Sequence, residues 1–257
     1  MVWAVLADAD LSAVAELMVA KRATMLLALM GGRPLTAGEL ADRAAISPSL
    51  ASSHLSRLLD GGLITVQQTG RRRYYRLAGP EVAEVIEAAL TIAPAQPVST
   101  LRESRQGEAI RLVRTCYDHL AGAVGVALTD SLQHQGLLDT SGSGYTLTSR
   151  GERRLQSLGI DVDGLRTRRR AFARPCLDWT ERRPHLAGAL GSGIAGRVLE
   201  LGWLTRIPGG RALRITDAGT VALRDELGLN VAQIRRAGAT AAHAMSPAGR
   251  GSSISSH

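Results

Sequence analysis

Residues 35–77 constrain this chain most, because they combine two helix starts with a cationic β-hairpin. Thr36 and Glu39 have the spacing of a capping box, in which each residue satisfies a backbone N–H at the start of a helix. Ser47 is a favoured N-cap and is followed by a proline, which suits the first helical position. Strand-forming residues after a pair of glycines then predict a hairpin whose turn, residues 67–73, carries three arginines.

Two short helices followed by a hairpin are the order of a winged helix-turn-helix. In the second helix, expected from residue 48 to about residue 60, the residues predicted to be buried are Leu50, Leu55, Leu58 and Leu59. A polar helix of this length fits the major groove of B-DNA, while a cationic hairpin reaches the flanking phosphates. We therefore expect DNA contacts from Ser47, Ser49, Ser52, Ser53, His54 and Arg57 on the helix and from Arg71, Arg72 and Arg73 on the hairpin.

The run LADRAAISPSLASSHLSRLLDGGLI, followed by TGRRRYYRL, resembles the ArsR/SmtB family of bacterial repressors, and the likeness covers about residues 10–92. This resemblance implies a homodimer that represses transcription from a palindromic operator until an effector releases it. Metal-sensing members of that family carry a Cys-x-Cys pair in the helix that here begins near Thr36. This chain has Leu, Thr, Ala and Gly at positions 35–38, so we expect that metal site to be absent.

Two further helices flank this module. Apolar residues recur at helical spacing from residue 11 to about residue 30, and Pro80 opens a helix over residues 81–92. Its residues expected on one apolar side are Val82, Val85, Ile86, Ala89 and Leu90. The resemblance implies that these two helices form the dimer interface; the alternative is that they only cover the winged-helix core.

The charge distribution is more informative than the net charge. At 257 residues the chain is expected to form one or two domains, and its formal charge of +8 favours a polyanionic partner in general terms. Residues 1–90 hold nine Lys or Arg and nine Asp or Glu, whereas residues 91–257 hold 22 and 14. The predicted DNA-binding module would therefore depend on its cationic wing rather than on an overall basic charge.

The second half contains an internal repeat. Residues 119–138 align without a gap with residues 185–204 and are identical at eight of twenty positions, including HLAGA at each start. Each copy predicts helix, helix, Gly-Leu, hairpin and helix, which is again a winged-helix plan. We expect these copies to serve effector binding or architecture, because each is too short for a recognition helix like the first; the alternative is a second DNA contact.

The predicted fold class is mainly α with small β-hairpin wings. Prolines at positions 94 and 97 mark a boundary, and the tail is rich in Gly, Ser and Ala. The expected division is a DNA-binding and dimerisation domain at 1–92, a linker at 93–106, a first winged-helix-like repeat at 107–160, a connecting segment with the second repeat at 161–230, and a partly disordered tail at 231–257.

Two clusters carry most of the reactive side chains. Cys116 and His119 would share a face if they lay on one helix, and Cys176 and His185 could complete a four-coordinate metal site if the fold brought the copies together. The spacing matches no recognised zinc signature, and in the ungapped alignment the cysteines are not equivalent. A metal site and a redox pair of the two cysteines therefore remain weak alternatives.

His119 and His185 precede the same residues in both copies, which favours a structural role for each, capping or bridging within its own module. The functional alternative is a site for a small-molecule effector, lined by Tyr117, His119, Trp179 and His185. Aromatic walls with a few convergent polar groups are typical of small-molecule sites.

Other classes of protein fit the sequence less well. A small-molecule methyltransferase can begin with a winged helix, but residues 100–230 contain no strand–GxGxxG–helix unit, and no catalytic triad or carboxylate pair is evident. We therefore expect no enzyme activity and no cofactor, and the polar helix with its wing argues against a pure protein-interaction adaptor. Two cysteines, no apolar run of about 18 residues and no secretory signal pattern lead us to expect the bacterial cytoplasm.

Overall fold

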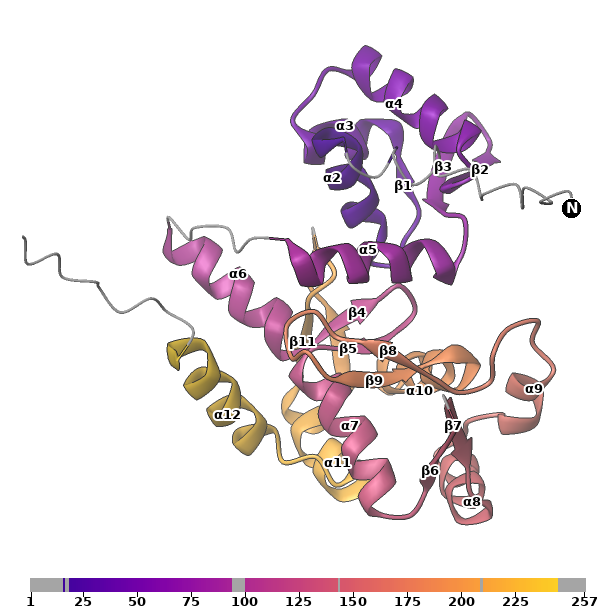
Figure 1. Ribbon diagram of the computed structural model, residues 1–257, viewed down its shortest axis with the longest axis vertical. Coiled ribbons are helices and arrows are strands. Elements are labelled where there is room, and N and C mark those ends of the chain that lie inside the picture. Colours follow the sequence, from indigo (N-terminus) through magenta and orange to yellow (C-terminus); the bar gives the residue numbers. More distant parts are fainter. Residues whose placement is uncertain (1–15, 17–18, 94–99, 143, 209, 245–257) are drawn as a thin grey trace, which may run out of the picture.

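The computed structural model describes residue 16 and residues 19–93, 100–142, 144–208 and 210–244. Figure 1 shows the N-terminal helices and wing at one end, helix α5 (Pro80–Ile92) across the middle, and the C-terminal half at the other end. Among the described residues, no helix is both long and apolar enough to cross a membrane.

The N-terminal part is a winged helix-turn-helix. Its helices are α2 (Ala20–Leu29), α3 (Ala37–Ala44) and α4 (Pro48–Asp60). Its strands, β1 (Leu35–Thr36), β2 (Ile64–Thr69) and β3 (Arg72–Leu77), form one antiparallel sheet in the order β1-β3-β2. The turn of the wing is shorter than predicted, because β2 and β3 stay paired as far as Thr69 and Arg72.

Capping explains where α3 and α4 begin. The backbone N–H of Thr36 donates to Oε2 of Glu39 at 2.8 Å, and the N–H of Glu39 donates to Oγ1 of Thr36 at 3.3 Å. Oγ of Ser47 accepts from the N–H of Leu50, with a proline at the first helical position. The predicted capping box and N-cap are confirmed, so both helix starts are encoded locally.

One predicted core residue of α4 is wrong. The helix buries Ala51, Leu55 and Leu58, which recur at spacings of four and three, but Leu50 is 45% exposed. Leu50 lies one position before Ala51, and one residue turns an α-helix by about 100°, so it points away from the buried stripe. Leu59 is partly buried against the same core.

Helix α5 joins the two halves of the molecule. It buries Ala83, Ile86 and Glu87, whereas Val85, predicted on the same side as Ile86, is 41% exposed. Glu87 forms ion pairs with Arg114 and Arg211 of the C-terminal half. The next helix, α6 (Leu101–Leu112), begins inside the segment expected to be a linker and is capped by its own Thr–Glu box.

The C-terminal half repeats one order of elements. The first copy contains β4 (Arg114–Cys116), β5 (His119–Ala121), α7 (Ala123–His134), β6 (Leu138–Ser141), β7 (Gly144–Leu147) and α8 (Ser149–Ser157). The second contains β8 (Arg174–Leu177), β9 (Pro184–Ala187), α10 (Gly188–Glu200), β10 (Leu204–Arg206), β11 (Leu213–Ile215) and α11 (Asp217–Leu227). Helix α9 (Val162–Arg166) connects them, and α12 (Val231–Ala244) occupies most of the predicted tail, of which residues 245–257 lie outside the described chain.

The predicted pair of helices at the start of each copy is wrong. Each HLAGA run is the end of a short hairpin and the start of a single helix, so the copies have the order hairpin, helix, hairpin, helix. In the first copy, Gly122 follows β5 with a φ of +79°, and a Cβ there would lie 2.6 Å from the carbonyl oxygen of Arg111. Residues of β5 are buried on both faces, and such a short buried run has no alternation that distinguishes strand from helix.

Candidate nucleic-acid interface and a buried Cys–His cluster

Helix α4 turns a polar face to solvent at one end of the molecule (Figure 1). Most of the side chains expected to contact DNA are exposed there, namely Ser47, Ser49, Ser52, Ser53 and Arg57. Their hydroxyls are partly engaged, since Ser47 caps the helix and Oγ of Ser52 donates to the carbonyl of Pro48. His54 is half-buried, and its Nδ1 is buried without a hydrogen-bond partner.

The exposed Leu50 belongs to the same face, although the sequence analysis placed it in the core. It lies in the first turn of α4 between two exposed serine positions, Ser49 and Ser52. An apolar side chain in that place has the chemistry to contact a thymine methyl group in a major groove. The sequence could have shown this, because Leu50 lies one residue away from the helical spacing of Ala51, Leu55 and Leu58.

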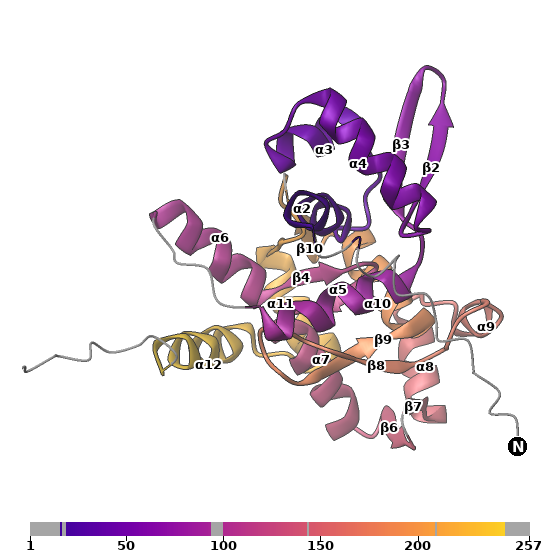
Figure 2. The ribbon, with the colours of Figure 1, turned by 45° about the horizontal axis from the view of Figure 1, so that its top comes forward.

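The wing lies beside α4 and rises from the same end of the molecule (Figure 2). Arg71 is at its tip, and Arg72 and Arg73 follow in β3 opposite Thr69 and Gln68. All three arginines are exposed and make no ion pair with any part of the chain that the structure describes. Because side chains alternate along a strand, Arg72 and Arg73 point to opposite faces of the hairpin.

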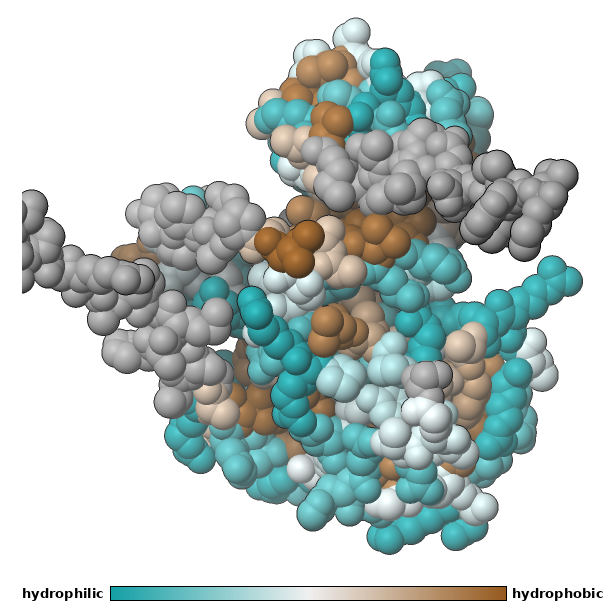
Figure 3. All heavy atoms as spheres, in the orientation of Figure 1, coloured by the Kyte–Doolittle hydropathy of each residue, from teal (hydrophilic) through white to brown (hydrophobic). Residues whose placement is uncertain are grey.

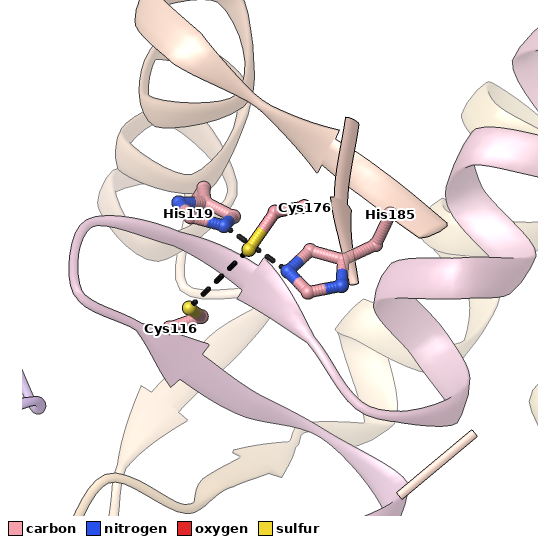
Figure 4. Close-up of side chains that lie close together, drawn as sticks. All are labelled: Cys116, His119, Cys176 and His185. Atoms are coloured by element: carbon pink, nitrogen blue, oxygen red, sulfur yellow. Dashed lines mark hydrogen bonds between the residues drawn. The ribbon is translucent and has the colours of Figure 1, made fainter. Parts of the chain in front are cut away.

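A second candidate site is the Cys–His cluster, formed by Cys116, His119, Cys176 and His185 (Figure 4). All four residues are buried, and one ligand atom from each lies within 4.8 Å of the others. The two sulfur atoms are 3.9 Å apart and the two Nε2 atoms are 3.1 Å apart. The fold thus brings together the two pairs that the sequence placed 60 and 66 residues apart.

The geometry corrects two expectations about these residues. Cys116 and His119 do not share a helix face; they pair across the hairpin β4–β5, and Cys176 and His185 pair in the same way across β8–β9. The cysteines are therefore equivalent in the two copies. The ungapped alignment missed this because the second hairpin has a longer loop, whereas the repeated pattern Arg-x-Cys-x-Asp would have revealed it.

Each imidazole of the Cys–His cluster faces a carboxylate with its other nitrogen. Nδ1 of His119 lies 3.4 Å from Oδ1 of Asp118, and Nδ1 of His185 lies 3.5 Å from Oδ2 of Asp178. Asp178 is itself held by Arg114 at 3.0 Å and by the N–H of Gly122 at 2.6 Å. These aspartates are the Asp of the repeated Arg-x-Cys-x-Asp pattern and were not assigned a role from the sequence.

Burial and charge act in opposite directions on these carboxylates. Burial alone would raise the pKa of Asp118, but hydrogen bonds from His119 and Arg170 lower it to about 2. Burial likewise opposes ionisation of Asp178, but the Arg114 guanidinium beside it holds its pKa well below the usual range. Both aspartates are therefore anionic at neutral pH and favour a proton on the facing Nδ1 atoms.

The two thiols differ in acidity. The hydrogen bond between them raises the pKa of Cys116 and lowers that of Cys176, so negative charge is favoured on Cys176 rather than on Cys116. Hydrogen bonds from His119 and His185 also lower the pKa of Cys176. The Cys–His cluster thus already stabilises negative charge on one sulfur.

The four residues of the predicted effector pocket do not line one cavity. His119 and His185 are 3% and 0% exposed and contact each other, so no organic molecule fits between them. Tyr117 instead lines a separate cavity of about 120 Å³ with Leu29, Gly32, Arg76, Leu77 and Asp118, beside the base of the wing. Trp179 lies under Arg114, whose guanidinium carbon is 5.2 Å from the ring centre.

Comparison with known proteins gives one extensive likeness. The family described as "Helix-turn-helix domain" matches residues 20–67. The uncharacterised HTH-type transcriptional regulator YdfF of Bacillus subtilis (strain 168) is 48% identical over 210 residues, covering 82% of this chain and 93% of that protein. Because this match extends far beyond the winged helix, it includes most of the C-terminal half.

Two similar solved structures each cover about a third of this chain. Reduced HlyU from Vibrio cholerae N16961 is 27% identical with a TM-score of 0.29, covering 32% of this chain and 85% of its own. A fragment of a possible transcriptional regulatory protein from Mycobacterium bovis is 28% identical with a TM-score of 0.30, covering 33% and 95%. At such TM-scores these two structures carry no weight, and the Bacillus protein is the informative relative.

Proposed function

Because the chain belongs to the HTH-type transcriptional regulators, which are DNA-binding proteins, we propose that it is a homodimeric repressor of the ArsR type. In this proposal α4 of each protomer enters one major groove of an inverted-repeat operator, and each wing contacts the flanking backbone. The observation that carries the proposal is the polar, solvent-facing side of α4 beside a wing with three unpaired arginines.

The wing supplies affinity in this proposal, whereas α4 supplies discrimination. Arginines on phosphates release counterions and bind all sequences alike, while groups on α4 face base edges. Changing Arg71 and Arg72 together to Ala should weaken binding to operator and random duplexes equally and flatten the salt dependence of affinity. Changing Ser52 or His54 to Ala should instead reduce the ratio of operator to random-sequence affinity.

Fluorescence anisotropy at several salt concentrations measures both effects on the full-length protein. Arg150→Ala, a change of an exposed arginine in the distant helix α8, is the matched control for lost charge and should leave affinity unchanged. If the wing and α4 variants all bind operator as the wild type does, the proposed interface is wrong.

The exposed side of α5 supports the homodimer. Val85 is 41% and Ile92 83% exposed on this helix, and Figure 3 shows hydrophobic surface across the middle of the molecule where α5 lies. Apolar side chains gathered on one exposed helix mark protein-interaction surfaces. The double variant Val85→Glu/Ile92→Glu should therefore be monomeric in light scattering. The control Val221→Glu, on α11 far from α5, should leave the dimer intact. A monomeric wild-type protein would contradict the homodimer.

We also propose that the C-terminal half is the effector-responsive part. Its elements contact α5 through Glu84 and Glu87, and α5 is the helix that the proposed dimer uses. A ligand that altered these contacts would change the relative placement of the two recognition helices. The test is to measure operator affinity with and without each ligand that binds the C-terminal half. If none of these ligands changes the affinity, this part of the proposal is wrong.

A further inference from the structure

We propose that the Cys–His cluster is a metal site, in which Cys116, His119, Cys176 and His185 bind one Zn²⁺ per chain in tetrahedral geometry. The site is independent of the proposed repressor function, because it is defined by side chains of the duplicated half alone. It is also distinct from a site at the start of α3, where residues 35–38 offer no thiol.

The two histidines present their Nε2 atoms to each other and to the two sulfur atoms, which is the arrangement that a metal ion needs. Asp118 forms a hydrogen bond with Nδ1 of His119, and the Asp178 carboxylate lies 3.5 Å from Nδ1 of His185 without a hydrogen bond, so a neutral imidazole with its proton on Nδ1 has a lone pair on Nε2 for a metal ion. The two Nε2 atoms are only 3.1 Å apart, so their lone pairs would face each other across the Cys–His cluster. Either a proton or a metal ion must lie there, and two sulfur ligands are already in place for a metal.

The spacing of the donor atoms fits zinc. With Zn–S bonds of about 2.3 Å and Zn–N bonds of about 2.0 Å, a tetrahedral site holds its sulfurs about 3.8 Å and its nitrogens about 3.3 Å apart. The corresponding distances here are 3.9 and 3.1 Å. The sulfur pair and the nitrogen pair therefore already have the separations of a tetrahedral site, and the sulfur–nitrogen separations, which reach up to 4.8 Å, would shorten as the ion draws the two pairs together.

The surroundings of the Cys–His cluster have the features of a metal site. Both histidines have a carboxylate on the nitrogen that faces away, which fixes the tautomer and strengthens the ligand. Two sulfur and two imidazole donors select zinc and related ions over the hard cations Mg²⁺ and Ca²⁺. All four residues are buried, so the site has no room for additional water ligands and is closed, as structural zinc sites are.

The position of the site indicates what the ion would connect. Each hairpin supplies one Cys and one His, so a bound ion would join the two copies at their contact. A chain of ion pairs then leads from His185 through Asp178 and Arg114 to Glu87 of α5. The ion would thus lie inside the duplicated half, one chain of ion pairs away from α5.

Cobalt titration of the reduced, metal-stripped, full-length protein tests the site directly. We expect one equivalent of Co²⁺ to give the visible bands of a tetrahedral ion with thiolate-to-cobalt charge transfer, and one equivalent of Zn²⁺ to displace it. Cys116→Ser and Cys176→Ser should each reduce the charge-transfer band. Asp118→Asn should keep the tetrahedral spectrum but weaken zinc affinity about 10- to 100-fold, because it keeps all four ligands and weakens the support of His119, along with the ion pair to Arg170.

A matched control is His134→Gln, which alters an exposed histidine of α7 and should bind zinc as the wild type does. If a cysteine variant fails to fold, the wild-type titration and the Asp118→Asn variant still test the proposal. Asp118 is partly exposed, so we expect this variant to fold. The proposal is overturned if reduced wild-type protein takes up no Co²⁺, gives only a six-coordinate spectrum, or binds zinc equally well without Cys116. A reduced protein that binds no metal and forms a Cys116–Cys176 disulfide in air would identify a redox pair instead.

Discussion

Leu50 and Leu55 show how one residue position decides the role of a side chain in α4. Leu55 lies on the buried stripe of the helix, while Leu50 falls beside it and stays 45% exposed in a face of serines. Leu50 contributes little to the folded core, and the proposed DNA interface gives its side chain a partner outside the chain. A thymine methyl group is the base feature that such a side chain can recognise.

Leu50→Ala should therefore reduce discrimination at one operator position without affecting stability. We expect the preference for thymine over other bases at that position to fall by about 1–3 kcal/mol, the usual value of one specific base contact. Anisotropy with duplexes substituted at each position measures it, and the melting temperature should remain within about 1 °C because Leu50 is not in the core. A loss of stability comparable to that of Leu55→Ala would place Leu50 in the core instead.

The Cys–His cluster shows which site residues the sequence can and cannot predict. The four side chains were identified as candidates from their chemistry, but their convergence depends on how two hairpins pack together, which no local pattern encodes. Two residues separate Cys116 from His119 and eight separate Cys176 from His185, so the ungapped alignment hid their equivalence. The supporting aspartates become meaningful only once the imidazoles are placed.

At the scale of elements, the sequence predicts best where local hydrogen bonds decide. The capping box of α3 and the N-cap of α4 follow from the residues themselves, and so does the wing. The short strands β5 and β9 were predicted as helices, because burial on both faces removes the alternation that identifies a strand. Their conformation is instead set by tertiary contacts, among them the close packing of glycines in α7 and α10 on the strands.

Gly125 and Gly196 offer a matched test of that packing. A Cβ on Gly125 of α7 would lie 2.5 Å from the carbonyl oxygen of Leu120 in β5, whereas nothing lies within 4 Å of one on Gly196 of α10. Gly196→Ala should stabilise the protein by about 0.5–1 kcal/mol, because alanine favours a helix interior. Gly125→Ala should destabilise the protein by about 1–3 kcal/mol, because the backbone of α7 or β5 must move. Equal melting temperatures for the two variants would refute the close packing of Gly125 on Leu120.

At the scale of the whole molecule, the two halves share buried contacts rather than a simple linker. Cys116, Ala121, Cys176 and Ala187 pack against the core of the winged helix, and the N–H of Tyr117 donates to the carbonyl of Met30 at 3.0 Å. Glu87 is 1% exposed and holds both Arg114 and Arg211. A change in the duplicated half therefore has a direct physical route to α5 and α2.

Glu87→Gln tests this junction. It leaves two buried guanidinium groups with one partner fewer, so we expect a loss of about 3–5 kcal/mol in the free energy of unfolding. Glu84→Gln breaks a pair with Arg174 that is partly open to solvent and should cost no more than about 1 kcal/mol. Urea denaturation measures both, and similar costs for the two variants would mean that Glu87 does not hold the halves together.

The most direct measurement of the central claim is selection of DNA from a pool of random duplexes with the full-length protein. Two copies of α4 related by a dimer axis should enrich an inverted repeat whose half-site centres lie about one helical turn, 10–10.5 base pairs, apart or a multiple of it. The Arg71→Ala/Arg72→Ala variant should enrich the same sequence with lower yield, because the wing contributes affinity rather than readout. Failure to enrich any sequence, or enrichment of a single site without symmetry, would contradict the account of a dimeric, sequence-reading repressor.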